Sequence, residues 1–300
     1  MTSAPTIPRR ALWLLVLLTV VWGTNWPLFP YAVQEISVWT FRAIALPTAG
    51  LTLLAVARAR GQSLKIPRED WPTVLGASLC YLTVWNVTST YAAVLLPSGQ
   101  AAILGFTMPL WAALIGVMVL GHRLTRRMVV ALAFGGAAVV LLMWRSLPAY
   151  ADAPAGFAHG LGSAIGWAVG TLILKHRPPR APAAVLTGWQ LLVASVPIVA
   201  VALAVGEGPW FLPSWPSLLV IAYITWMPMT LGNLTWFSIV GLLPAQVAGL
   251  SSVMVPVVAM LSGALIRAEP LGPVHLAAMA CSAAALWLAL RAPHRPARSG

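Results

Sequence analysis

Charge is the property that this sequence has least of. Only 8% of its 300 residues are charged, and six are acidic, whereas soluble domains carry about 25% charged residues. A soluble protein with so little charge would expose large apolar patches and aggregate. Because 60% of the residues are hydrophobic, the composition excludes the soluble globular class and predicts an integral membrane protein.

Several functional motifs are missing as well. The two cysteines, Cys80 and Cys281, lie inside apolar runs and form neither a CxxC pair nor a Cys/His metal site. No GxGxxG or Walker sequence is present, so ATP-driven transport is not supported. We therefore expect no metal and no cofactor. The first apolar run follows Arg9 and Arg10 without a small-x-small site at its end, so no cleavable signal is expected.

The net charge of +12 is not arranged for binding nucleic acid. The Lys and Arg residues occupy the gaps between apolar runs and do not form one stripe. An integral-membrane enzyme acting on lipids would need paired carboxylates, a histidine cluster or a nucleophile–base pair. The sequence offers none of these at a recognisable spacing, so we expect no enzymatic activity.

Ten apolar segments are long enough to cross a bilayer, which takes about 20 residues each. They are residues 11–33, 37–57, 71–93, 98–120, 128–146, 154–174, 183–205, 215–240, 245–266 and 272–291. If the N-terminus is cytoplasmic, 15 of the 18 Lys and Arg residues fall on the cytoplasmic side and two fall outside. This asymmetry follows the positive-inside rule. We predict a multi-pass protein of the inner (cytoplasmic) membrane with both termini in the cytoplasm.

An internal repeat divides the chain. LLPSGQAAILGFTMPLWAALIG from Leu95 aligns without gaps with LLPAQVAGLSSVMVPVVAMLSG from Leu242, at an offset of 147. The spans before these segments both open with Trp-Pro, and the second is three residues longer. Each half therefore has five helices, and because five is odd, the second half enters the membrane upside down. We predict an all-α protein with two inverted five-helix repeats, residues 1–146 and 147–300, in one compact transmembrane unit.

Inverted repeats are characteristic of secondary transporters, whose substrate site lies near the midplane between the halves. Pro109 and Pro256 occupy equivalent central places in spans four and nine. Both should kink their helices, and we expect them to act as paired hinges. Gly162, Gly166 and Gly170 recur every four residues on span six and predict close helix packing.

Short motifs add a resemblance to a known family. They are Trp22-Gly23-Thr24-Asn25 in the first span, Phe41-Arg42 in the second, the prolines of spans four and nine, and Glu269 at the end of span nine. With these the chain resembles the drug/metabolite transporter (DMT) superfamily in its EamA-like ten-helix branch, and is most similar to the YddG-type aromatic amino-acid exporters. The resemblance implies export of small metabolites. His122 departs from it, because the family has a glutamate there.

Residues 20–30, VVWGTNWPLFP, interrupt an otherwise apolar helix. Pro27 removes the hydrogen bond back to Gly23, so the carbonyl of Gly23 needs a neighbour, a water or a ligand. We expect a bend here, close helix approach at Gly23, and a cavity wall that includes Asn25. A kink with Asn25 bonded to a neighbouring helix is the alternative.

Arg42 lies about five residues into the second span. It either extends its side chain to the outer interface or attracts a substrate carboxylate. The acidic residues lie outside the midplane, so no buried carboxylate is available for a proton relay. A near-neutral midplane suits a zwitterion or an uncharged organic molecule.

Mixed aromatic and polar stripes mark three further helices at helical spacing. The predicted substrate-binding residues are Trp22, Thr24, Asn25, Ser78, Tyr81, Trp85, Gln100, Thr107, Trp111, Trp167, Trp226, Thr230 and Asn233. Each polar side chain could instead form an interhelical hydrogen bond, worth about 0.6 kcal/mol. Aromatic and amide groups side by side match an amphipathic ligand, so the stripes together favour a cavity.

The sequence thus predicts a secondary transporter that exports aromatic or hydrophobic amino acids and related metabolites by alternating access. Its expected partners are aromatic amino acids, threonine-like or other near-neutral metabolites, and the lipid bilayer, without nucleic acid. Nothing in the sequence fixes the oligomeric state, and a monomer is expected. A broad-specificity drug/metabolite carrier is the alternative, and a lipid-modifying enzyme is the disfavoured alternative of another class.

Overall fold

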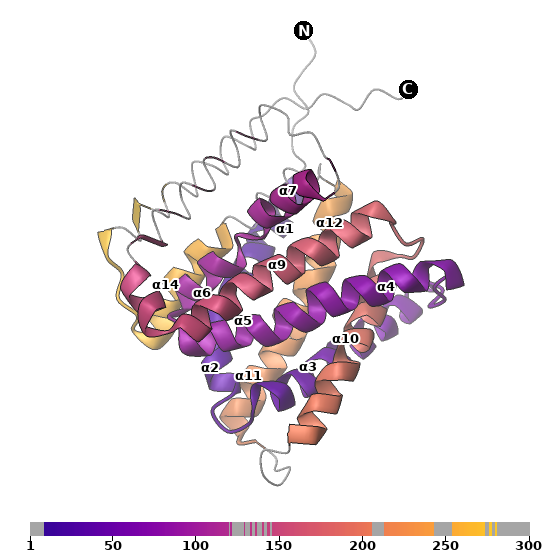
Figure 1. Ribbon diagram of the computed structural model, residues 1–300. Coiled ribbons are helices and arrows are strands. Elements are labelled where there is room, and N and C mark those ends of the chain that lie inside the picture. Colours follow the sequence, from indigo (N-terminus) through magenta and orange to yellow (C-terminus); the bar gives the residue numbers. More distant parts are fainter. Residues whose placement is uncertain are drawn as a thin grey trace.

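The computed structural model describes residues 9–119, 146–205, 213–242 and 254–273, with isolated residues and pairs between 121 and 144 and between 276 and 280. Over this part of the chain every regular element is a helix (Figure 1). Six segments there are long and apolar enough to cross a membrane: Arg10–Ala32, Val38–Ala59, Ser98–Met118, Pro154–His176, Ala183–Val205 and Trp215–Trp236. Each coincides with a predicted span, which confirms those six by length and composition.

Of the four remaining predicted spans, one is described in full and three in part. The third, 71–93, is a continuous helical run from Trp71 to Leu95. The ninth overlaps a shorter apolar helix, α14 (Val255–Arg267). The fifth and tenth spans lie largely outside the described residues, as do both termini. The count of ten helices and the cytoplasmic termini therefore stay predictions.

Most helices that cross the molecule are built from more than one piece. The first half contains α1 (Arg9–Gly23), η1 (Trp26–Leu28), α2 (Phe29–Ala32), α3 (Val38–Ala59), η2 (Arg68–Asp70), α4 (Trp71–Ala77), η3 (Ser78–Thr83), α5 (Val84–Leu95), α6 (Ser98–Gly105) and α7 (Met108–Met118). The second half contains α9 (Pro154–His176), α10 (Ala183–Val205), α11 (Trp215–Ile224), η4 (Thr225–Gly232), α12 (Asn233–Leu242) and α14.

The first span is interrupted where the sequence predicts a bend. Helix α1 ends at Gly23, and Thr24 and Asn25 form a turn before η1 and α2 continue the path. A Cβ atom at Gly23 would collide with Val258 on α14, so the predicted close approach is confirmed. The neighbour next to the freed carbonyl is Ser262, whose hydroxyl donates to the carbonyl of Val258 at 2.7 Å and lies 3.5 Å from the Gly23 oxygen.

Pro109 begins a new helix, whereas we expected a kink inside a continuous helix. For Pro256 the residues before Met254 lie outside the described part of the chain. Span four breaks between α6 and α7, and Pro109 stands at the second position of α7. Pro256 stands at the second position of α14. Proline is favoured there because the first turn of a helix leaves its N–H groups unpaired in any case.

The helices that open with Trp-Pro share an irregularity. Both η3 and η4 are π-helices, and their first residues, Ser78 and Thr225, are 147 positions apart, which is the offset of the repeat. A π-helix is formed by i→i+5 hydrogen bonds and is frequent at functional sites. Its wider turn changes which later side chains share a face with earlier ones.

Glycines bring the helix backbones together at two crossings. A Cβ atom on Gly50 of α3 would lie 2.9 Å from the carbonyl oxygen of Gly188 on α10. On α9, a Cβ atom on Gly166 would lie 2.7 Å from the carbonyl oxygen of Cys80, and one on Gly170 would collide with Tyr81. The close packing predicted from the glycine spacing of span six is therefore confirmed at Gly166 and Gly170, with η3 as the partner, but not at Gly162.

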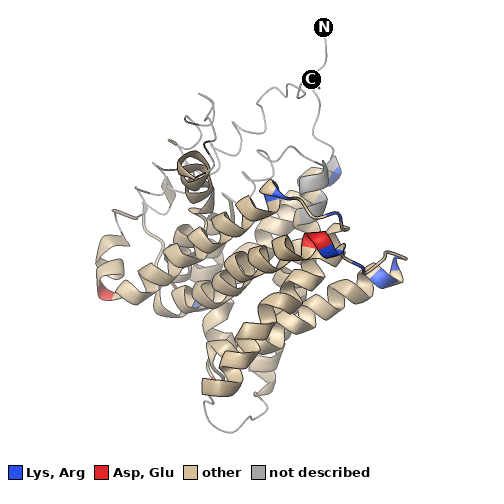
Figure 2. Ribbon diagram, turned by 45° about the vertical axis from the view of Figure 1, so that its right-hand side comes forward, with Lys and Arg blue, Asp and Glu red and all other residues tan. Residues whose placement is uncertain are grey.

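Most basic residues of the described bundle lie at one end of it (Figure 2). The end of α3, the loop after it and the end of α9 meet there, since Arg180 forms an ion pair with Glu69 and its N–H donates to Asp70 at 2.9 Å. By the positive-inside rule this end is the predicted cytoplasmic end. The helix that opens at Trp71 begins here.

The opposite end of the bundle holds a contact between Glu35 and Ser214. Glu35 precedes α3, a helix of 22 residues, which spans about 33 Å. Its carboxylate accepts hydrogen bonds from the N–H and hydroxyl of Ser214 at 2.6 and 2.5 Å. Because Trp215 follows directly, the second Trp-Pro helix begins at the end opposite to the first.

Candidate functional site

A cavity of about 60 Å³ lies between the helices of both halves. Its aromatic wall is formed by Trp22, Trp26, Phe29, Trp85, Phe106 and Trp167, and its polar wall by Asn25, Arg42, Asn86, Ser89 and Asn233. Leu82, Met108, Leu191, Pro228 and Met229 complete it. The volume holds several water molecules but is well below the about 300–1,000 Å³ of small-molecule pockets. The cavity is therefore too small to enclose a drug-sized molecule as it stands.

The indoles of the aromatic wall contact one another edge to face. The ring centroids of Trp85 and Trp167 are 4.8 Å apart, those of Trp22 and Trp167 are 6.2 Å apart, and those of Trp26 and Trp85 are 6.2 Å apart. Phe106 lies 6.0 Å from Trp85. Such arrangements contribute about 0.5–1.5 kcal/mol per pair beyond buried area. The wall is a connected aromatic surface that draws on helices from both halves of the chain.

Two glycines make room for this surface. A Cβ atom on Gly105 would lie 2.9 Å from the Trp26 ring and 3.2 Å from the Trp85 ring. One on Gly232 would collide with the Trp22 ring, whose Nε1 donates to the carbonyl of Pro228 at 3.1 Å. The indoles can occupy these positions because glycine has no side chain.

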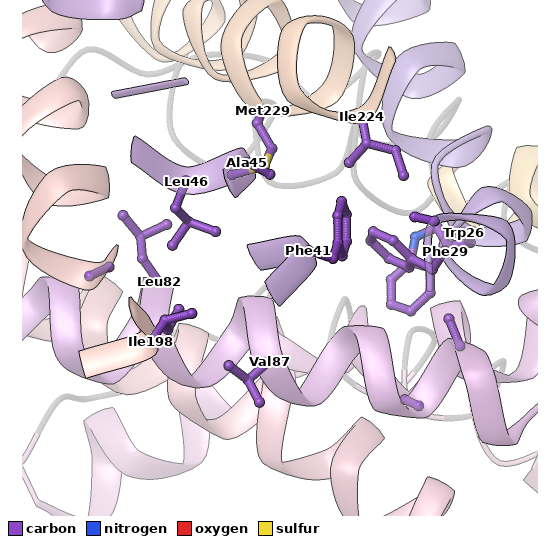
Figure 3. Packing of buried hydrophobic residues seen from close by; sticks show 14 of the residues in the cluster. Trp26, Phe29, Phe41, Ala45, Leu46, Leu82, Val87, Ile198, Ile224 and Met229 are labelled. Atoms are coloured by element: carbon purple, nitrogen blue, oxygen red, sulfur yellow. The ribbon is translucent and has the colours of Figure 1, made fainter. Parts of the chain in front are cut away.

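Arg42 does not extend to the outer interface. Its side chain is 1% exposed, and the guanidinium carbon lies 4.6 Å from the Phe29 ring centroid and 4.7 Å from that of Phe41. Figure 3 shows Phe41 facing Phe29 and Trp26. The guanidinium thus lies over the faces of two neighbouring rings, a favourable contact for a cation.

Thr90 fixes the direction of the guanidinium. Arg42 Nε donates to Thr90 Oγ1 at 2.8 Å, and the Thr90 hydroxyl donates to the carbonyl of Asn86 at 2.7 Å. Because its hydrogen is committed to Asn86, the threonine presents a lone pair to Arg42. Arg42 Nη1 also points to the sulfur of Met229 at 3.7 Å.

Asn86 and Asn233 occupy equivalent positions in the two halves. They are 147 residues apart, and each follows the π-helix of its half. Asn86 Nδ2 donates to the carbonyl of Leu82 at 2.8 Å, and Asn233 Nδ2 donates to that of Met229 at 2.5 Å. Both asparagines therefore use the NH₂ group on the helix backbone four residues earlier.

Two more polar groups of the cavity wall lack partners within the described part of the chain. Asn25 Oδ1 and Ser89 Oγ are buried and form no hydrogen bond there. Buried polar atoms are usually hydrogen-bonded, so these atoms are available to whatever fills the cavity. No carboxylate lines the cavity among the described residues.

Five of the predicted substrate-binding residues line the cavity: Trp22, Asn25, Trp85, Trp167 and Asn233. Tyr81 does not line the cavity but packs against a residue that does. Its ring centroid lies 4.8 Å from that of Trp167, and its hydroxyl donates to Gln190 at 3.4 Å. The hydroxyl of Thr24 lies 2.7 Å from that of Tyr223. Tyr81 and Thr24 therefore support neighbouring elements.

The other predicted hydroxyl groups serve the helix backbone. Ser78, Thr107 and Thr230 donate to carbonyls of their own helices at 2.5, 2.6 and 2.9 Å. Trp111 Nε1 donates to Thr107 Oγ1 at 3.1 Å. Gln100 Oε1 is buried without a partner in the described residues. None of these five residues lines the cavity.

Trp226 departs furthest from the expectation. Its side chain is 48% exposed and lies away from the cavity. The predicted stripe of Trp226, Thr230 and Asn233 assumed a regular helix, whereas η4 spans Thr225–Gly232. The wider π-helical turn rotates Trp226 away from the face that carries Asn233.

Sequence reasoning missed several residues of the wall. Asn86, Ser89, Trp26 and Phe29 line the cavity, although they were not among the predicted binding residues. The repeat contains the signal for Asn86, because an offset of 147 from Asn233 leads directly to it.

Comparison with known proteins identifies the family. The model of the EamA-like transporter family matches residues 9–144 and again residues 155–291. The chain belongs to this family. It is therefore a multi-pass membrane transporter and not an enzyme, as the sequence predicts.

Relatives match most of the chain at low identity. An uncharacterized transporter of Bacillus subtilis, YvbV, is 27% identical over 88% of this chain and 85% of its own. A probable amino-acid metabolite efflux pump of Salmonella typhimurium is 25% identical over 93% of this chain and 94% of its own. One crystal structure superposes with a TM-score of 0.70 at 20% identity, covering 93% of this chain and 96% of that chain. That likeness supports the fold alone.

Proposed function

We propose that this EamA-family transporter exports aromatic and other hydrophobic amino acids, and related near-neutral metabolites, across the inner membrane. The observation that carries the proposal is the cavity wall, where four indoles adjoin one buried guanidinium. An aromatic side chain placed among Trp22, Trp85 and Trp167 would gain the edge-to-face contacts that indoles favour. The name of the Salmonella relative supports amino-acid metabolites as substrates and efflux as the direction.

Alternating access is the proposed mechanism, with residues 1–146 and 147–300 as inverted five-helix repeats. The two separate matches to the family model support a repeat. The opposite ends at which Trp71 and Trp215 begin their helices support the inversion.

Pro109 and Pro256 are the proposed hinges. The helices α7 and α14 each begin one residue before the proline, and proline lacks the N–H that would tie it to the preceding turn. Rotation at these two places breaks few backbone hydrogen bonds, so each half can move one helix segment relative to the rest.

Counterflow in proteoliposomes tests the function. We expect liposomes that contain the purified full chain and unlabelled tryptophan to accumulate labelled tryptophan. Trp85→Ala and Trp167→Ala should each lower the rate by about 10- to 100-fold, because each removes a buried aromatic contact worth about 1.5–3 kcal/mol. Trp226→Ala is the matched control outside the cavity, and it should change the rate by no more than about twofold.

Two outcomes contradict the proposal. The first is tryptophan transport that persists in both cavity variants. The second is transport of unrelated organic cations without transport of tryptophan, which favours a broad-specificity drug/metabolite carrier.

A further inference from the structure

Arg42 is a buried cation without a carboxylate partner. Among the described residues that line the cavity it alone is charged, and its side chain is 1% exposed. The ion pairs found in the described part of the chain are formed by Arg180 and Arg267. Ionised groups inside a membrane protein are costly and usually pair with an opposite charge. A substrate in the cavity could therefore supply the anion that the protein does not.

The guanidinium has donors to spare. An arginine carries five N–H groups in a planar fork. Here Nε binds Thr90, and one N–H of Nη1 points to the sulfur of Met229, a weak acceptor. The guanidinium forms no other hydrogen bond to a described residue. A planar fork with free N–H groups matches the two oxygens of a carboxylate.

The asparagines on both sides of Arg42 present acceptors. Their NH₂ groups are committed to backbone carbonyls, and an oxygen turned toward a carbonyl would be repelled, so each Oδ1 must point the other way. Each asparagine is linked to Arg42 through one other residue. Thr90 accepts from Arg42 and donates to the Asn86 carbonyl, and Met229 contacts Arg42 through its sulfur and Asn233 through its carbonyl. Side-chain oxygens that accept no hydrogen bond from the protein suit an ammonium group.

The charged and aromatic parts of the cavity are continuous. The guanidinium lies over Phe29, whose ring centroid is 5.9 Å from that of Trp26, and Trp26 in turn contacts Trp85. A molecule with two opposite charges at one end and a ring at the other fits this order of groups.

We propose that Arg42 binds the substrate carboxylate and that the side-chain oxygens of Asn86 and Asn233 bind the substrate ammonium group. The cavity then selects the zwitterionic α-amino acid over amines and acids that carry the same ring. This proposal rests on the proposed function as an aromatic amino-acid transporter, and it names the part of the substrate that the polar wall recognises.

Three indoles test the selection in the wild-type protein. Unlabelled tryptophan, tryptamine (without the carboxylate) and indole-3-propionic acid (without the ammonium) compete with labelled tryptophan in the counterflow assay. We expect tryptophan to compete at least about tenfold better than either analogue, the effect of one charge-assisted hydrogen bond. Equal competition by all three overturns the proposal while leaving tryptophan transport established. Transport of none of them overturns the proposed function itself.

Substitution of Arg42 separates binding from folding. Arg42→Met removes the charge and leaves an unbranched side chain. It should raise the KM for tryptophan by about 10- to 100-fold without lowering the direct uptake of tryptamine. Arg42→Lys keeps the cation and should retain the preference for tryptophan over tryptamine. A structural role predicts that both uptakes fall together in Arg42→Met, and that result overturns the proposal. If Arg42→Met does not fold, the wild-type competition decides alone.

Discussion

Ser98 binds both oxygens of the Glu269 carboxylate. The Ser98 N–H lies 3.1 Å from Oε1 and 3.0 Å from Oε2, and its hydroxyl donates to Oε1 at 2.8 Å. The contact ties the beginning of α6 to the end of α14, which are the helices next to the two proline breaks. At an offset of 147, the counterparts of Ser98 and Glu269 are Ala245 and His122, so the same carboxylate–serine contact cannot form there. This contact is therefore specific to one half of the repeat.

Replacing this carboxylate should loosen one end. Glu269→Gln removes the charge from three hydrogen bonds, and we expect a loss of about 1–3 kcal/mol. Thermal unfolding in detergent and hydrogen exchange of the Ser98 amide measure the effect. Asp152→Asn is the matched control, because Asp152 is exposed. An unfolding temperature for Glu269→Gln equal to that of the control would show that the contact contributes nothing.

The contact of Glu35 with Ser214 should depend on pH. Hydrogen bonds from the Ser214 hydroxyl and then from its N–H lower the pKa of Glu35 below its ordinary value of 4.5. A lowered folded-state pKa means that the stabilisation is complete above pH 4.5 and disappears as the pH falls through the folded value. The unfolding temperature of the wild type should therefore exceed that of Glu35→Gln at pH 7, and the difference should shrink below about pH 4.5. A difference that stays constant down to pH 3 would contradict the assignment.

Gly105 should be intolerant of a methyl group. Gly105→Ala places a Cβ atom against the rings of Trp26 and Trp85, and overpacking of this kind costs about 1–3 kcal/mol. We expect a lower unfolding temperature and slower tryptophan counterflow. Gly76→Ala is the control in helix α4, since nothing lies within 4 Å of its added Cβ. That change should be neutral or stabilising by up to about 1 kcal/mol, and equal behaviour of the two variants would argue against the tight contact.

The two asparagines should contribute alike. Asn86→Ala and Asn233→Ala remove equivalent side chains from the polar wall, so each should raise the KM for tryptophan by about tenfold. Neither should lower the unfolding temperature greatly, because alanine is the better helix former. Gln62→Ala, outside the cavity, is the control. A large effect from one asparagine and none from the other would show that the two halves do not share the ligand.

The fold followed from features that tolerate local error. The apolar runs and the distribution of Lys and Arg are averages over many residues, so one misjudged residue does not change them. The repeat rests on the gapless alignment of the segments that begin at Leu95 and Leu242. The site was harder because a face drawn at a regular helical spacing fails once a π-helix intervenes. That is why Trp226 was predicted to line the cavity and Asn86 was not. The burial of Arg42 could not be inferred from span two alone, because it depends on Phe29 from the interrupted first span.

Arg42 also bears on what the cavity keeps out. A fixed positive charge beside a narrow, water-sized space repels protons and hydrated cations, much as an arginine does in water-conducting pores. We expect this barrier in the empty carrier, because the rings of Phe29 and Phe41 hold the guanidinium in place. The side chain that we propose binds the substrate carboxylate would then also preserve the ion gradients across the membrane while no substrate is bound.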